Sequence, residues 1–78
     1  MPDLDARLLA AHEVGDAVQL SALYTEAADA REAAGDVEAA CFYLTHAYVF
    51  ALEAGLPEAA ALNQRLASYG RDVAQLDL

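Results

Sequence analysis

The sequence predicts an all-α fold, with one small helical domain over residues 1–78 made of four short antiparallel helices in pairs or in a small bundle. Three observations predict it. Alanine, the best helix former because it loses no side-chain entropy on folding, supplies 20 of the 78 residues. Glycine, which favours helix ends, recurs at positions 15, 35 and 55, with a fourth at 70. Apolar residues between the glycines repeat with the helical period.

The turns between the helices are marked by short residue pairs. Gly15-Asp16 and Gly35-Asp36 each combine a glycine that ends one helix with an aspartate that begins the next. At the third turn, Pro57 lies in the first turn of the last helix instead. Such short connections make consecutive helices antiparallel neighbours. The predicted helices span about 3–14, 17–34, 37–54 and 57–70, and residues 71–78 form a short tail or continue the last helix to about 76.

Each predicted helix except the third has one apolar face, with acids or amides on the other side. The expected core residues of the first helix are Leu4, Leu8 and Ala11; those of the second are Leu20, Leu23, Tyr24, Ala27 and Ala34; and those of the fourth are Ala59, Leu62, Leu66 and Tyr69.

The third helix is apolar around most of its circumference. Between Glu38 and Glu53 lie 14 uncharged residues, whereas a helix that crosses a bilayer needs about 20. We therefore expect a helix buried in the protein and no membrane span. At 100° per residue, its core stripe is Ala40, Leu44, Ala47 and Ala51, with Tyr43 and Phe50 on one flank and Cys41, Tyr48 and Leu52 on the other.

Phe42 and Val49 lie seven residues apart in the middle of the polar arc of the third helix, which also holds Glu38, His46 and Glu53. Apolar residues surrounded by polar groups are typical of protein interfaces. These five residues are the predicted protein-binding site. In the alternative interpretation, the first helix or the C-terminal tail folds over the same patch.

Residues 24–54 resemble a tetratricopeptide-type helix pair. After the Gly-Asp turn, Ala40, Leu44 and Ala47 stand where the second helix of that repeat carries a small, a bulky and a small residue. In the first helix of the pair, the large, apolar and small residues that the family prefers correspond to Tyr24, Ala27 and Ala28.

Two features depart from the repeat. Arg31 stands where the family usually has an aromatic residue, and the proline near the repeat end is displaced to Pro57, so the unit has about 40 residues rather than 34. The resemblance implies peptide or protein recognition. It makes the side of the second helix that carries Tyr24 and Arg31 a second candidate surface.

The charge balance limits the classes of partner. Four arginines and no lysine stand against 13 acids, which gives a net charge of -9 and a pI of about 4.2. Phosphate backbones and anionic lipids repel such a chain, so we expect no nucleic-acid or membrane partner. The N-terminus carries acids where a secretory signal would be basic, and the lone Cys41 has no internal disulfide partner. Both observations favour the cytoplasm.

No residue pattern indicates catalysis or a metal. Cys41 and His46 are about 140° apart around the helix and cannot share a metal ion as an i, i+4 pair could, and His12 suits the end of a helix. No serine, threonine or cysteine has a recognisable base and orienting acid. We expect no enzyme activity, cofactor or metal. A third hypothesis, a ligand-binding bundle, would need a pocket lined by Tyr24, Tyr43 and Cys41.

The favoured hypothesis is a small acidic protein-interaction module of adaptor or scaffold type, which associates with itself as a homodimer. The alternative is an acidic inhibitor that mimics a polyanion and occupies a basic site on another protein. The net charge of -9 motivates this alternative.

Overall fold

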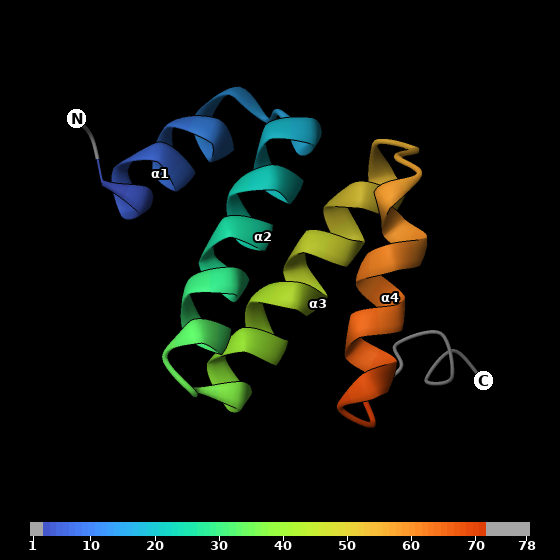
Figure 1. The fold of residues 1–78 in the computed structure, drawn as a ribbon. Helices are drawn as coiled ribbons and strands as arrows, with labels where there is room; N and C mark the ends of the chain where they lie inside the picture. Colours follow the sequence, from blue (N-terminus) through green and yellow to red (C-terminus); the bar gives the residue numbers. More distant parts are fainter. Residues whose placement is uncertain (1–2, 72–78) are drawn as a thin grey trace.

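Four α-helices form a small all-α bundle in the computed structural model, which describes residues 3–71 (Figure 1). They are α1 (Leu4–Val14), α2 (Ala17–Ala33), α3 (Val37–Glu53) and α4 (Glu58–Ser68). The predicted fold class is confirmed, and each helix begins and ends within two residues of its predicted limits. The expected tail or continuation beyond residue 71 lies outside the described residues.

The first three helices begin after aspartate caps, which the sequence predicted at Asp16 and Asp36 but not at Asp3. The side chains of Asp3, Asp16 and Asp36 each accept a hydrogen bond from the backbone N–H three residues later, at 2.9, 3.1 and 3.1 Å. Gly15 follows α1 with a φ of 67°, a left-handed conformation that costs glycine little because it has no Cβ. At α4 the prediction was slightly wrong, because Pro57 precedes the helix as its cap residue and Glu58 is the first helical residue.

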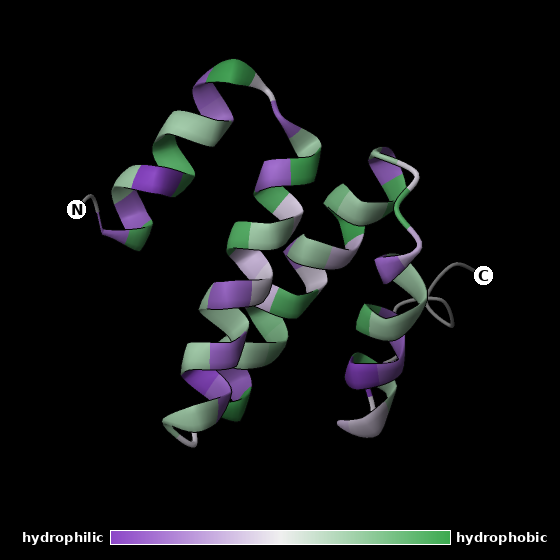
Figure 2. Cartoon of the chain, turned by 45° about the horizontal axis from the view of Figure 1, so that its top comes forward, coloured by the Kyte–Doolittle hydropathy of each residue, from purple (hydrophilic) through white to green (hydrophobic). Residues whose placement is uncertain are grey.

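Helices α2 and α3 lie side by side in the centre, with α4 against α3 and α1 against α2 (Figure 1). Figure 2 shows hydrophobic and hydrophilic residues alternating along α1 and α4. The larger core cluster joins α2, α3 and α4 and consists of Ala28, Cys41, Leu44, Ala47, Ala51, Ala59, Leu62 and Leu66. The smaller cluster joins α1 to α2 and consists of Ala11, Leu20 and Leu23, with Leu4, Leu8, Tyr24 and Phe50 packed against it.

The core prediction for α2 was wrong at one position. Ala34 is exposed because it is the cap residue after the helix, next to the Gly35 turn. The face of α2 that packs on α3 instead includes the fully buried Ala28 and the hydroxyl of Ser21, which donates a 2.9 Å hydrogen bond to the carbonyl oxygen of Ala47. Ser21 is thus a buried polar residue with its donor satisfied.

Three of the four arginines join helices through acids. Arg7 of α1 donates two hydrogen bonds, at 3.0 and 2.9 Å, to the carboxylate of Glu26 on α2. Arg65 of α4 reaches Asp29 at 2.8 Å and Glu32 at 3.2 Å, both on α2. The third pair, Arg71 with Glu38, links the end of α4 to the start of α3.

The expectation that α3 does not span a membrane agrees with the structure. None of the helices within residues 3–71 combines the length and the apolar character that a bilayer crossing requires.

Candidate protein-interaction surface

The side of α3 that faces away from α2 and α4 carries a line of residues that we call the outer stripe: Phe42, Thr45, Val49 and Leu52. Phe42, Val49 and Leu52 are 57%, 48% and 56% exposed, and Thr45 is half-buried. Their spacing of three, four and three residues is the spacing that a helix uses to pack along another helix. The outer stripe therefore has the spacing of a helix-packing seam, and no helix from residues 3–71 covers it.

Phe42 packs against neighbouring side chains of α3 although its ring is exposed. The Nδ1 of His46 lies 2.9 Å from the carbonyl oxygen of Phe42, and because a carbonyl only accepts, the histidine N–H donates. The His46 and Phe42 ring centroids are 4.5 Å apart, and the ring of Tyr43 meets Phe42 edge-on at 5.4 Å. The ring of Phe42 therefore contacts two neighbouring rings of α3 while more than half of the residue stays exposed.

The ring contacts continue from His46 into the interior between α2 and α1. Tyr24 lies 5.1 Å from His46, 6.1 Å from Tyr43 and 5.8 Å from Phe50, measured between ring centroids. At its far end, the Tyr24 hydroxyl lies 3.0 Å from Nε2 of His12, in the last turn of α1. Phe42 is thus the exposed end of a row of contacting aromatic rings that connects α3 to α2 and α1.

A hollow of about 250 Å³ adjoins the ring of Phe42. Its lining consists of Glu38, Cys41, Phe42, Thr45 and Arg71. Cys41 is buried there, as the sequence predicted, and the guanidinium of Arg71 donates to the carboxylate of Glu38. The pair raises the pKa of Arg71, first through this hydrogen bond and then through the charge of Glu38. The hollow therefore has the apolar ring residue Phe42 on one side and Glu38, which is paired with Arg71, on another.

The structure keeps the predicted site residues of α3 on one side of the helix. Phe42, Val49, Glu38 and Glu53 are exposed, and His46 is half-buried against Phe42. The alternative in which the first helix covers the patch is wrong, because α1 packs on α2. The alternative in which the C-terminal tail covers it concerns residues outside the described range.

The two residues of the second predicted surface, on α2, differ in exposure. Tyr24 is half-buried in the row of rings, whereas Arg31 is exposed near the end of α2. Leu52 was predicted to flank the core stripe, and this prediction was wrong because its side chain belongs to the outer stripe. The spacing 42, 45, 49 and 52 is the sequence signal that could have identified Leu52 as a site residue.

The ligand-binding hypothesis would require a pocket lined by Tyr24, Tyr43 and Cys41. The two tyrosine rings stack against each other, and Cys41 instead lines the hollow beside Phe42. Within residues 3–71, no group of three or more His, Cys, Asp or Glu side chains is placed to hold a metal ion.

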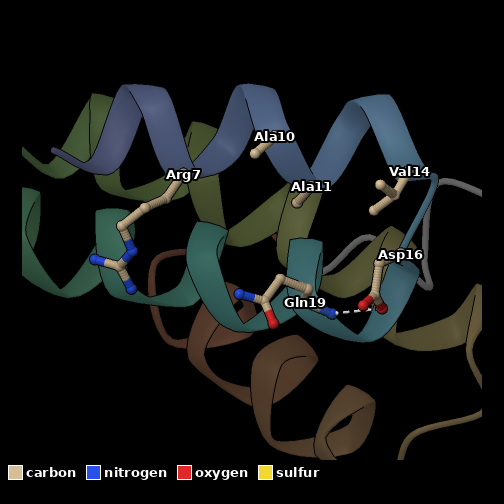
Figure 3. Close-up of a pocket in the computed structure, with 6 residues that line it drawn as sticks. All are labelled: Arg7, Ala10, Ala11, Val14, Asp16 and Gln19. Carbon is tan, nitrogen blue, oxygen red and sulfur yellow. Dashed lines mark hydrogen bonds between the residues drawn. The ribbon is translucent and has the colours of Figure 1, made fainter. Parts of the chain in front are cut away.

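A second hollow, of about 320 Å³, lies between α1 and α2. Figure 3 shows Arg7 extending from α1 toward α2, and Asp16 accepting the backbone N–H of Gln19. The charged groups of this hollow are engaged, because Arg7 pairs with Glu26 and Asp16 caps α2. The charged residues of the hollow beside Phe42, Glu38 and Arg71, are paired as well, and that hollow is the one that adjoins the outer stripe.

Comparison with protein-family models, curated proteins and solved structures finds no match to this chain.

Proposed function

We propose that the chain is a helical protein-interaction module of adaptor or scaffold type, which docks on a protein partner through the outer stripe of α3. The observation that carries the proposal is Phe42, whose ring is 57% exposed and packs against the rings of His46 and Tyr43. An aromatic side chain has few rotatable bonds and a large apolar area, which makes it an effective anchor. Val49 and Leu52 extend the apolar contact along the helix.

The exposed apolar residues of the outer stripe contribute little to the stability of the folded chain. Large apolar side chains in water add nothing to the buried area of the folded chain, and a row of them on one helix face marks an interaction site. Polar residues border the stripe, with Glu38 before it and Glu53 after it. An apolar centre with a polar rim is the usual arrangement of a protein interface.

The resemblance of residues 24–54 to a tetratricopeptide-type pair supports recognition of a protein or peptide. The residues that carry the resemblance in the second helix are Ala40, Leu44 and Ala47, and all three are fully buried. The proposal assigns no catalytic role to the chain and places it in the cytoplasm, in keeping with its single free Cys41.

The polyanion mimic has less support from the placement of the acids. Asp3, Asp16 and Asp36 cap helices. The acids Glu26, Asp29, Glu32 and Glu38 form ion pairs with arginine. A mimic needs an array of free carboxylates, whereas at least seven of the 13 acids have structural partners.

Capture of partners from the cells that make the protein tests the proposal. The wild type, Phe42→Asp and Val49→Asp would serve as baits, with Leu9→Asp as the matched control, because Leu9 is 63% exposed but lies on α1. We expect a partner that the wild type and Leu9→Asp retain and that both α3 variants lose. Equal capture by all four proteins would contradict a role for the outer stripe.

Sedimentation of the wild type and Phe42→Asp tests the predicted homodimer, a second candidate for the same surface. A symmetric dimer through α3 would bury both outer stripes, so the variant should sediment as a monomer. If the wild type and Phe42→Asp are both monomers of equal stability, the outer stripe is not a homodimer interface.

A further inference from the structure

The chemistry of the partner follows from the charges around the outer stripe, and this inference rests on the proposed function. Helix α3 contains no lysine or arginine, and Glu38 and Glu53 lie just before and just after the stripe. The whole chain carries a net charge of -9. A protein that approaches the stripe therefore meets an apolar seam with Glu53 at one end and Glu38, paired with Arg71, at the other, on a chain of net negative charge.

This charge pattern argues against a second copy of the chain as the occupant. In an antiparallel contact between two outer stripes, Glu38 of one copy would oppose Glu53 of the other at both ends. A parallel contact would oppose identical acids. Like charges facing each other across an interface are unfavourable, and the net charges add repulsion at a distance.

The same argument applies to the chain's own C-terminal residues. Residues 72–78 include Asp72 and Asp77 and contain no basic residue. Their sequence offers apolar side chains to the stripe but no charge that complements Glu38 or Glu53.

We propose that the outer stripe binds a basic amphipathic α-helix of another protein. Apolar side chains of that helix, spaced three and four residues apart, would pack along Phe42, Thr45, Val49 and Leu52. Lysine or arginine residues beside them would meet Glu38 and Glu53. The stripe covers ten residue steps, or about 15 Å of helix axis, so about three turns of the partner would cover it.

The hollow beside Phe42 already contains an example of the contact that we propose. Arg71 lines this hollow together with Phe42 and Thr45, and its guanidinium donates to Glu38. A cation can therefore pair with Glu38 next to the apolar seam. A basic residue of the partner would form the same pair and compete with Arg71 for the carboxylate.

Three synthetic peptides of three heptads each test the inference. The first has leucine at the seam positions and lysine beside them, the second has glutamate in place of lysine, and the third is a scrambled version of the first. Fluorescence anisotropy of the labelled peptides, titrated with the full-length protein, measures binding. We expect the lysine peptide to bind at least about tenfold more tightly than either control.

Neutral substitutions locate the binding surface without adding charge. Phe42→Ser should weaken binding of the lysine peptide at least about tenfold, because it removes the aromatic anchor. Val49→Ser should weaken it less, and Leu9→Ser should leave it unchanged. Glu53→Gln should weaken it about two- to fivefold, as expected for an exposed ion pair, and the loss should shrink at high salt.

Each contrary result has a distinct meaning. Equal affinity for the lysine and scrambled peptides, or for the lysine and glutamate peptides, would overturn the basic helix as partner. A wild-type dimer that Phe42→Asp dissociates would assign the stripe to a second copy, and nuclear Overhauser contacts from Phe42 to residues 72–78 would assign it to the chain's own end. The dimer result would overturn this inference and leave the interaction surface standing. Unchanged peptide affinity in both Phe42→Ser and Val49→Ser would overturn the proposed surface as well.

Discussion

The inner face of α3 and its outer stripe differ in residue size as well as in exposure. The inner face consists of Ala40, Leu44, Ala47 and Ala51, all with 0% exposure. The outer stripe carries Phe42, Val49 and Leu52, each about half exposed. The alanines of the inner face allow α2 and α4 to approach α3 closely. The large apolar residues of the outer stripe lie where no other helix among the described residues packs. The difference indicates that the inner face contributes to folding, whereas the outer stripe contributes little buried surface to it.

The largest expected effect is a cavity on the inner face. Leu44→Ala should lower the free energy of unfolding by about 3 kcal/mol, because a fully buried leucine is replaced and the site collapses only in part. A domain of 78 residues has a total stability of about 4–12 kcal/mol, so this loss would be severe.

Leu52→Ala is the matched control for Leu44→Ala, since it is the same substitution on the outer stripe of the same helix. It should change the free energy of unfolding by less than about 0.5 kcal/mol. Urea denaturation monitored by circular dichroism measures both variants. Equal losses in the two would show that the faces do not differ in their contribution to folding.

A second variant tests whether the inner face requires small residues for the close packing of α2 on α3. Ala47→Leu should destabilise the protein by about 1–3 kcal/mol, because Ala47 has 0% exposure and its carbonyl oxygen accepts the Ser21 hydroxyl across the α2–α3 contact. Ala30→Leu, at an exposed position of α2, is the control and should have little effect. Calorimetry on the two variants gives the comparison, and a stable Ala47→Leu protein would mean that the helices are not closely packed there.

A smaller effect concerns pH and the contact between α2 and α4. The hydroxyl of Tyr69 donates to the carboxylate of Glu32, and this bond, with Arg65 as the second partner, lowers the pKa of Glu32 below its ordinary value. Ionised Glu32 therefore stabilises the fold above the unfolded pKa of about 4.3, and this contribution is lost as the pH falls through the lowered pKa. Removing the Tyr69 hydroxyl should reduce the loss of folding stability at low pH.

Tyr69→Phe should accordingly show a weaker decrease in stability than the wild type between about pH 5 and pH 3. Tyr48→Phe, which alters another half-buried tyrosine of the same core cluster, should keep the wild-type dependence. Thermal unfolding across this range measures the effect. Identical pH profiles for Tyr69→Phe and the wild type would contradict the contribution of the Tyr69–Glu32 bond.

The smallest effect on stability is expected at the proposed anchor. Phe42→Ser should change the free energy of unfolding by about 0.5 kcal/mol or less, because the ring is 57% exposed. Urea denaturation provides the measurement. A loss above about 2 kcal/mol would mean that Phe42 supports the fold through His46 and Tyr43, which would remove the main reason to call it a binding residue.

The sequence predicted the helices well because their signals are local. Asp16 and Asp36 begin α2 and α3, and Gly15 and Gly35 end the helices before them, through bonds between residues only a few positions apart. The exposure of Phe42 and Val49 was also predicted, since it follows from their angle around α3. The prediction failed at Ala34 and Leu52, where a position close to a core stripe by angle has no neighbouring helix to cover it.

By itself, the sequence determined four helices, their caps and the inner face of α3, because helical period and capping depend on residues three or four apart. Only the tertiary structure decided which distant groups meet: Arg65 with Asp29 and Glu32, His12 with Tyr24, and Arg71 with Glu38 beside Phe42. Such contacts depend on the angles at which helices cross and on the positions at which they end. Periodicity along one helix carries no information about either quantity, so the hollow beside the outer stripe became visible only in the folded chain.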